Sequence, residues 1–248
     1  MITVEHLTKT FGGVQAVNNC SFTVPRGKII GLIGPNGAGK TTVFNIITGF
    51  MRSDSGNIIF DRTEISHLRP DQIFQLGISR TFQSIRLFPK LTVLENVLLA
   101  IKGQREGAIH AVIRLPMWRR ATKHHREKAH EILAQVGLQG KENERAGEIS
   151  YGQQKLLEIA RALASDPELL LLDEPAAGVN PTLLKQIRDL LLNLKKQGKT
   201  ILLVEHDMEF VMGICDSIVV LDYGKEIALG TPKEICKNPK VLEAYLGA

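Results

Sequence analysis

The spacing of apolar residues changes along this chain, and the first stretch follows the two-residue period of β-structure. Strands are predicted there over residues 2–6, 20–24 and 29–33. The third, Ile-Ile-Gly-Leu-Ile, carries no polar side chain, which is typical of a strand buried on both faces. Beyond a glycine-rich segment a helix is predicted over residues 40–48, followed by a strand over 57–60 and a helix over 70–76.

Residues 87–147 differ from the preceding part of the chain, because no convincing strand pattern is found in them. Thr92 and Glu95 form a capping-box pattern at the start of an apolar run. A second helix is predicted over residues 119–136, with Gly137 after it. We interpret this stretch as a helical insertion between two halves of an α/β core.

The last third of the chain alternates helices with strands. Helices are predicted over residues 150–164 and 181–197, and strands over 169–172, 200–204 and 218–221. This alternation predicts a parallel sheet with helices on both faces. Two further caps, Thr231 before Pro232 and Asn238 before Pro239, open short helices.

Composition narrows the possible functions only slightly. The chain has 248 residues, of which 44% are hydrophobic and 23% charged, which is ordinary for a globular protein with a sizeable core. A net charge of +5 favours a solvated surface over a nucleic-acid footprint. The three cysteines are far apart in the sequence and form no zinc or disulfide pattern. This cysteine pattern fits a reducing compartment. The start of the chain has neither the basic segment nor the apolar run of a signal peptide, and no stretch approaches the length of a membrane span.

The glycine-rich segment carries the most specific chemical signal. Residues 34–41 fit G-x-x-x-x-G-K-[ST], in the strand-then-helix context that a phosphate-binding loop (P-loop) needs. Glycines let backbone N–H groups face phosphate oxygens, and the helix start adds the positive end of its dipole. Lys40 can reach the β- and γ-phosphates, and the Thr41 hydroxyl can ligate Mg²⁺. The predicted nucleotide-binding residues are Gly34, Pro35, Asn36, Gly37, Ala38, Gly39, Lys40, Thr41 and Thr42.

Two acidic residues follow the apolar strand at 169–172. A buried strand tolerates charge at its open carboxyl end, where open α/β sheets bind ligands. Asp173 is therefore placed to hold Mg²⁺, and Glu174 to polarise an attacking water as general base. The alternative is a strand whose last two residues have simply reached solvent.

The helix after the insertion begins with Ser-Tyr-Gly-Gln. Ser150 is its predicted N-cap and Gln153 completes a capping box, which is already a structural reason for both residues. Gly152 lies in the first turn, where a better helix former would serve, so we expect something to approach its backbone closely. A capped helix start with free N–H groups is also a second anion site.

These motifs, together with Glu205-His206-Asp207, occur in the order found in ATP-binding-cassette (ABC) ATPases, which the whole chain resembles. The resemblance implies a head-to-tail dimer of two cassettes with two ATP molecules between them. Ser150 and Gly152 would then contact the γ-phosphate bound by the other subunit.

Three further roles rest on the resemblance. Gln83 resembles the glutamine that contacts Mg²⁺ and water and couples the site to the membrane partner. His206 resembles the switch histidine on the γ-phosphate, and Phe11 the aromatic residue that stacks on adenine. From the sequence pattern alone, the preferred interpretation would be a loop amide for Gln83, a surface histidine for His206 and a core side chain for Phe11. The implied catalytic residues are Lys40, Gln83, Glu174 and His206, and the implied metal ligands are Thr41, Gln83 and Asp173.

Two positions depart from the family pattern. Tyr151 stands where glycine is usual, and we expect the site to keep its function because Ser150 and Gly152 are present. Asn180 stands where aspartate is common, and before Pro181 it also makes a good N-cap and N1 pair.

The resemblance implies a single ABC ATPase domain over residues 1–248, with a P-loop NTPase core and a mostly parallel sheet. Residues 1–84 and 153–248 would form the nucleotide-binding α/β core, with an N-terminal antiparallel β subdomain. Residues 85–152 would form an inserted α-helical subdomain.

Several segments resemble one branch of the family, the ATPase subunits of branched-chain amino acid importers. They are residues 80–83, 174–181, 205–208, the insertion around 115–120 and the ending from Asn238. This implies a peripheral subunit on the cytoplasmic face of the cell membrane. Its partners would be permease subunits, a second cassette that is identical or a paralogue, and indirectly an extracytoplasmic substrate-binding protein, with no nucleic acid.

Three other functions stay open at this point: an ABC exporter of lipid or polysaccharide, a soluble ABC ATPase outside transport, and a P-loop kinase. The permease would dock near the Gln83 loop, where the candidate lining residues, which could equally be core, are Leu87, Phe88, Leu91, Val93 and Leu94. The basic segment 114–128 is interpreted as a solvated helix face, with acidic lipid contact as the alternative.

Overall fold

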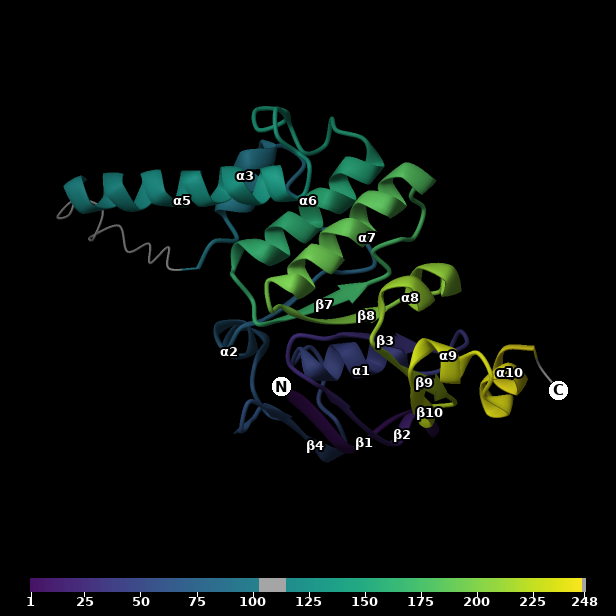
Figure 1. Ribbon diagram of the computed structural model, residues 1–248. Coiled ribbons are helices and arrows are strands. Elements are labelled where there is room, and N and C mark those ends of the chain that lie inside the picture. Colours follow the sequence, from purple (N-terminus) through teal and green to yellow (C-terminus); the bar gives the residue numbers. More distant parts are fainter. Residues whose placement is uncertain (103–114, 247–248) are drawn as a thin grey trace. The chain divides into compact units, whose positions relative to one another are not determined.

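The protein is represented by a computed structural model, which describes residues 1–102 and 115–246 (Figure 1). It divides into two compact units. The first comprises Met1–Gln83, Glu168–Gly178 and Leu184–Ala248, and the second Ser84–Pro167 and Val179–Leu183. The helical unit therefore extends to Pro167, whereas the division expected from the sequence ends it at residue 152.

In the part of the chain that the structure describes, the first unit contains two sheets. An antiparallel sheet has the order β2-β1-β4-β5. Its strands are β1 (Ile2–Phe11), β2 (Val14–Val24), β4 (Ser55–Phe60) and β5 (Thr63–Glu64). A second sheet has the order β10-β9-β3-β8-β7-β6. Its strands are β3 (Ile29–Ile33), β6 (Ile78–Arg80), β7 (Leu169–Asp173), β8 (Thr200–Val204), β9 (Ser217–Asp222) and β10 (Lys225–Gly230).

All neighbours in the second sheet are parallel except β10, which pairs antiparallel with β9. The predicted mostly parallel sheet and N-terminal antiparallel sheet are confirmed. Strands β3, β7 and β8 are buried along their whole length, and apart from Asp173 at the end of β7 and Thr200 at the start of β8 they carry no polar side chain.

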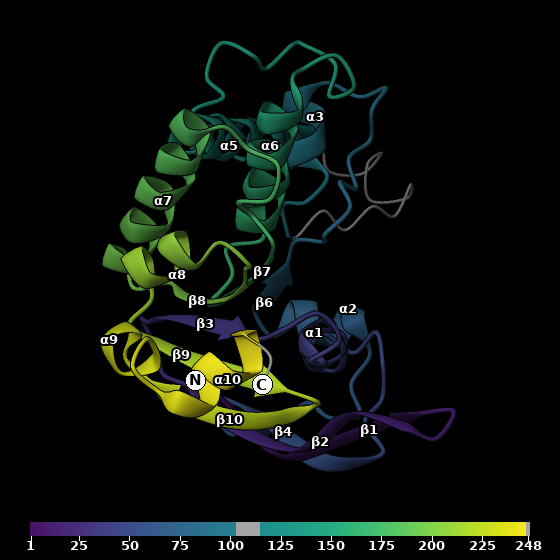
Figure 2. The ribbon, with the colours of Figure 1, turned by 90° about the vertical axis from the view of Figure 1, so that its right-hand side faces the viewer.

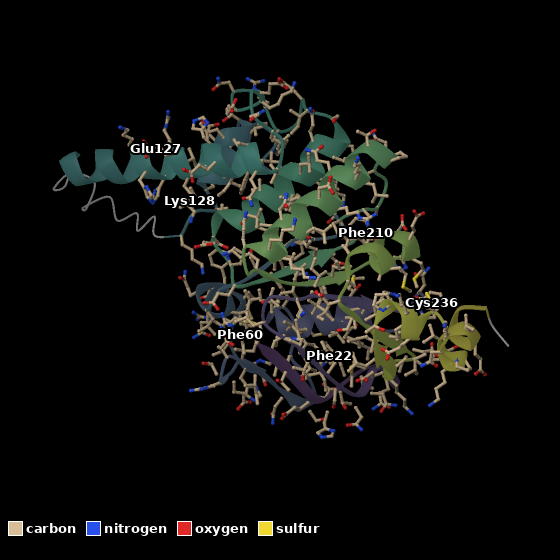
Figure 3. The ribbon with its side chains drawn as sticks, viewed as in Figure 1. Phe22, Phe60, Glu127, Lys128, Phe210 and Cys236 are labelled. Carbon is tan, nitrogen blue, oxygen red and sulfur yellow. The ribbon has the colours of Figure 1, made fainter. Side chains whose placement is uncertain are left out.

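The helices of the first unit pack on both faces of the parallel sheet. They are α1 (Lys40–Ile47), α2 (Pro70–Gln75), most of α7 (Pro181–Lys196), α8 (Met208–Ile214), α9 (Pro232–Ile235) and α10 (Pro239–Leu246). Helix α1 lies between the two sheets, because Phe44 shares one apolar cluster with Phe22 and Phe60 of the antiparallel sheet and with Leu32 of β3 (Figures 1 and 3). Helices α7 and α8 lie on the opposite side of the parallel sheet (Figure 1). The helix that begins at the P-loop is thus fixed from two sides.

The second unit is helical in its described residues, as the sequence predicts. It contains α3 (Val93–Leu98), α5 (Leu115–Gln135) and α6 (Tyr151–Ala164). The capping box before α3 is confirmed, because the Thr92 N–H donates to the Glu95 carboxylate at 2.8 Å and the Glu95 N–H donates to Thr92 Oγ1 at 3.1 Å. Val93 and Leu94 are buried, so they belong to the core, whereas Phe88 is exposed.

Helix α5 carries much of the basic segment. The side chains of Glu127 and Lys128 project from it (Figure 3), and the Lys123 ammonium lies 3.9 Å from the Glu127 carboxylate. Residue 114 and the side chains of Arg119 and Arg120 lie outside the described residues. Over the described helices, no segment is both long and apolar enough to cross a membrane.

Helix α8 and strand β10 are among the elements that were not predicted from the sequence. Helix α8 has only 7 residues, and β10 is an edge strand with one buried position. Helix α10 lies beside β10 at this edge (Figure 2). Both elements are too short or too exposed to show a clear hydrophobic period.

Candidate functional site

A cavity of about 260 Å³ lies beside the start of α1, within the first unit. It is formed where the chain leaves β3, β7 and β8, which is the edge at which open α/β sheets bind ligands. Its lining residues are Ala16, Asn36, Gly37, Ala38, Gly39, Lys40, Thr41, Thr42, Gln83, Glu174 and His206. The structure therefore brings together all four residues of the expected catalytic set, along with Thr41.

Two glycines of the P-loop occupy backbone conformations that other residues rarely adopt. Gly37 has φ 83° and Gly39 φ 98°. A Cβ on Gly39 would lie 2.3 Å from the carbonyl oxygen of Ala16, which is backbone and cannot turn away. The loop thus needs glycine both for its turns and for close packing on β2.

Lys40 is buried, and its ammonium stays within the loop. Nζ donates to the carbonyl oxygens of Gly34 at 2.7 Å and Pro35 at 2.9 Å. Burial lowers the Lys40 pKa, and the negative charges of Glu174 and Asp173 oppose that shift. A positive charge is therefore held where the loop would place phosphate oxygens.

Glu174 is the acidic residue that lines the cavity. It follows β7 directly and has φ 51°, a left-handed conformation that is uncommon for a residue with a long side chain. Gln83 Nε2 donates to Glu174 Oε2 at 3.2 Å, and His206 Nε2 lies 3.1 Å from Glu174 Oε1. His206 Nε2 is thus within hydrogen-bond distance of the Glu174 carboxylate. Gln83 and His206 together orient the Glu174 carboxylate.

Asp173 is the buried last residue of β7, and the Arg80 guanidinium holds one of its oxygens. Arg80 Nη2 donates to Asp173 Oδ2 at 2.8 Å. The oxygen donors expected for a metal are the Asp173 carboxylate, the Thr41 hydroxyl and the Gln83 amide. Among the described residues no group of three His, Cys, Asp or Glu side chains could hold a metal ion by itself. This donor set fits Mg²⁺, which is usually bound by one or two carboxylates together with substrate phosphates.

Glu205 is a site residue to which the sequence analysis gave no role of its own. Its side chain is buried, Oε1 accepts the Ala176 N–H at 2.6 Å, and Oε2 accepts the His206 N–H at 3.0 Å. Burial raises the Glu205 pKa, and these N–H donors oppose the shift. Glu205 therefore connects Ala176, in the loop after Glu174, to His206, whose side chain contacts Glu174. The sequence signal that could have identified Glu205 is an acidic residue directly after the apolar strand at 200–204.

The helix start with Ser150 belongs to the second unit, whereas the P-loop belongs to the first. The predicted capping box is confirmed, because the Ser150 N–H donates to Gln153 Oε1 at 3.0 Å and the Gln153 N–H donates to Ser150 Oγ at 3.3 Å. A Cβ on Gly152 would lie 2.4 Å from Leu183 Cδ2. Leu183 thus makes a close approach to Gly152 from within the chain.

The two positions that depart from the family pattern also lie in the second unit. Asn180 Oδ1 accepts the Leu183 N–H at 2.9 Å, as an N-cap side chain does, so the local reason for Asn180 is confirmed. Tyr151 is half exposed, with the Lys155 ammonium 5.9 Å from its ring centroid.

Phe11 is not among the residues that line the cavity. It ends β1 and pairs with Val14 across a tight turn, and 44% of its surface is exposed. The Lys9 ammonium lies 5.6 Å from the ring centroid. One face of the ring therefore has a cation near it.

Comparison with known proteins supplies independent information. The family model described as "ABC transporter" matches residues 17–177, and the one described as "Branched-chain amino acid ATP-binding cassette transporter" matches residues 225–248. The chain is 44% identical to the high-affinity branched-chain amino acid transport ATP-binding protein LivG of Escherichia coli (strain K12), with 100% of this chain and 98% of that protein covered. It is 43% identical to the corresponding protein BraF of Pseudomonas aeruginosa, with 100% and 98% covered.

Solved structures agree in fold. A nucleotide-free ATP-binding cassette from an ABC transporter aligns with a TM-score of 0.87 and 36% identity, covering 100% of this chain and 99% of that one. A dimeric post-hydrolysis cassette bound to ADP and Pi aligns with a TM-score of 0.78 and 27% identity, covering 94% and 99%.

Proposed function

The chain belongs to the ATP-binding cassettes of ABC transporters, and from this premise we propose that it is the ATP-hydrolysing subunit of an importer for branched-chain or other hydrophobic amino acids. Cassettes of this family hydrolyse ATP to power transport. The observation that carries the proposal is the cavity in which the P-loop, Gln83, Glu174 and His206 meet. The printed names of LivG and BraF, and the family match over residues 225–248, support the substrate class.

Hydrolysis is attack of a water oxygen on the γ-phosphorus while the bond to the β,γ-bridging oxygen breaks. The electron pair of that bond passes to the β-phosphate, and ADP and inorganic phosphate result. Glu174 accepts a proton from the water, with its carboxylate held by Gln83 and His206. Lys40 and the N–H groups of the P-loop bind the phosphates and stabilise the charge on them.

Mg²⁺ belongs to this proposal because the donors are the hard oxygens that it prefers. Thr41, Gln83 and Asp173 are the residues that would hold it. When bound, the ion would neutralise charge on the β- and γ-phosphate oxygens.

The second half of the proposal concerns dimerisation. Ser150, Gly152 and Gln153 would contact the nucleotide held by a partner cassette, identical or paralogous, and Phe11 would stack on adenine. The relative that is a dimer bound to ADP and Pi supports the dimerisation itself. ATP binding would close the dimer and hydrolysis would reopen it, which would drive permease subunits at the cytoplasmic face of the membrane.

The first test is Glu174→Gln, which keeps the size of the side chain but removes the base. Turnover should fall by about 10²- to 10⁴-fold, measured as phosphate release, while binding of a fluorescent ATP analogue is retained. Glu5→Gln, at an exposed position of β1, is the matched control and should keep full turnover. Undiminished hydrolysis in Glu174→Gln would remove Glu174 from the mechanism.

The second test identifies the partners. Extraction in mild detergent followed by mass spectrometry should recover a polytopic membrane subunit and a second cassette. Vesicles reconstituted with this complex and its binding protein should take up labelled leucine in preference to lysine when ATP is supplied. Recovery of ribosomes or DNA in place of a membrane subunit would contradict the transport function, and outward movement of lipid would favour an exporter.

A further inference from the structure

Arg80 is buried beside the nucleotide site, although the expected ATPase chemistry gives it no role. It is the last residue of β6, three residues before Gln83. Its side chain is only 5% exposed, and that of its partner Asp173 is 2% exposed. A buried ion pair is often no more stabilising than apolar side chains of the same volume, so stability alone is a weak reason for it.

The guanidinium joins three elements of the site. Nη2 donates to Asp173 Oδ2 at 2.8 Å. Nη1 donates to Asn45 Oδ1 at 2.7 Å and to Thr48 Oγ1 at 3.2 Å. Asn45 lies in α1, the helix that starts at the P-loop, and Thr48 is the C-cap of that helix. The Arg80 side chain therefore connects the P-loop helix, the strand that leads to Gln83, and the Asp173 carboxylate, which is an expected metal ligand.

Two aromatic rings lie close to the guanidinium. Its central carbon lies 5.4 Å from the ring centroid of Phe44 and 5.1 Å from that of Phe82. Phe82 in turn contacts Phe50 edge-on, at 5.5 Å between centroids. Arg80 Nε is buried and has no hydrogen-bond partner among the described residues. The arrangement thus leaves one donor unsatisfied while it directs the two terminal nitrogens at fixed acceptors.

The neighbouring residue, Thr81, holds the backbone of the residue that carries this carboxylate. The backbone N–H of Asp173 donates to Thr81 Oγ1 at 3.1 Å, and the Thr81 N–H donates to the Leu171 carbonyl at 3.0 Å. Both bonds lock β6 to the end of β7. No described residue donates to Asp173 Oδ1, so the bond from Arg80 leaves that oxygen for another ligand.

We propose that Arg80 is a positioning residue for the metal site: it holds Asp173 by Oδ2 so that Oδ1 faces Mg²⁺ or a water bound to it. This inference rests on the proposed function. Loss of a residue that orients a metal ligand typically weakens metal affinity by about 10- to 100-fold. Because β6 leads directly to Gln83, Arg80 also fixes the position of that strand relative to Asp173 and the P-loop helix.

The test compares Arg80→Lys with Asn45→Ala in the purified full-length chain. Lysine keeps the charge but cannot bond Asp173 and α1 at once through a rigid fork. Asn45→Ala removes the shorter of the two contacts to α1 and its end, and leaves the bond to Asp173. Binding of a fluorescent ATP analogue is titrated with Mg²⁺ and repeated in EDTA.

In Arg80→Lys the Mg²⁺ concentration for half-maximal binding should rise by about 10-fold, with the affinity in EDTA changed by less than about twofold. Asn45→Ala should leave the Mg²⁺ dependence unchanged. An unchanged Mg²⁺ dependence in Arg80→Lys would overturn the inference. A shift of equal size in Asn45→Ala would also overturn it, because Arg80 would then act only as a structural link between β6 and α1.

Thermal unfolding of each variant shows whether it is folded. If Arg80→Lys does not fold, Phe82→Leu replaces it, because that change loosens the guanidinium but keeps its charge and hydrogen bonds. Phe82→Leu should raise the Mg²⁺ requirement in the same direction by about threefold, and no change would refute the positioning role. Failure of the unsubstituted chain to bind the ATP analogue at all would instead refute the proposed function.

Discussion

Replacing Gly152 by alanine separates two reasons for a glycine at the start of α6. Within the chain, the new Cβ would lie 2.4 Å from Leu183 Cδ2, while the next atom, Leu183 Cγ, is 3.7 Å away. Only the tip of a flexible side chain has to move, at about 0.5–1.5 kcal/mol for an off-rotamer leucine. Alanine gains about 0.5–1 kcal/mol over glycine in a helix. The free energy of unfolding should therefore change by less than about 1 kcal/mol.

The effect on turnover should be far larger if a partner's nucleotide approaches this backbone. Loss of one contact to the developing charge lowers turnover by about 10²- to 10³-fold. We therefore expect Gly152→Ala to keep its urea unfolding midpoint but to lose phosphate release. In a Glu174→Gln background it should also lose the ATP-dependent dimer on size-exclusion chromatography.

The double variant Gly152→Ala/Leu183→Ala shows which contact matters, because the second change removes the atoms that the new Cβ meets. If displacement of Leu183 caused the loss, the double variant should recover turnover. If the phosphate contact is responsible, it should stay inactive, and Leu183→Ala alone should be active. Turnover of Gly152→Ala within about twofold of the unsubstituted chain would refute the idea that Gly152 meets a nucleotide.

Two further substitutions test buried polar groups. Burial raises the Glu205 pKa above its usual 4.5, so the folded chain favours the protonated carboxyl. The contribution of this carboxyl to the stability of the fold is therefore fully present below pH 4.5 and is lost as the pH rises through the raised pKa. Glu205→Gln should remove that part of the pH dependence of the melting temperature, and parallel pH profiles for the two proteins would contradict this. Asn96 is fully buried, its Nδ2 donates to the carbonyls of Phe88 and Thr92 at 3.0 Å each, and its Oδ1 accepts the Phe88 N–H at 2.9 Å. Asn96→Leu should lower the free energy of unfolding in urea by about 2–4 kcal/mol, because these backbone groups lose their partner, and a loss below about 0.5 kcal/mol would show that water replaces it.

Local signals in the sequence were sufficient for the elements that make the P-loop. The five apolar residues of β3, the glycines after them and the helical period of α1 each depend on neighbours in sequence. The same holds for the capping boxes at Thr92 and Ser150, whose partners lie three residues on. These features could be predicted because a turn or a cap satisfies its hydrogen bonds within a few residues.

Contacts between distant segments could not be predicted in this way. The bond from Arg80 to Asp173 exists because β6 lies beside β7. The order of strands in a sheet cannot be deduced from the spacing of apolar residues within each strand. Leu183 as the neighbour of Gly152 is a contact of the same kind. Gln83 and His206 came from family resemblance, since the partner that they share, Glu174, is far from both in sequence.

The order of strands in the parallel sheet has a consequence for synthesis of the chain. Strand β3 is flanked by β8 and β9, with Ile29 opposite Ile201 and Ile30 opposite Ser217. A ribosome therefore releases the strand that leads to the P-loop long before either neighbour exists, with two open edges and an apolar surface. Such long-range pairing is slow and exposes the nascent chain to aggregation. Truncated products that lack β8 and β9 should therefore depend on chaperones or proteases for their removal.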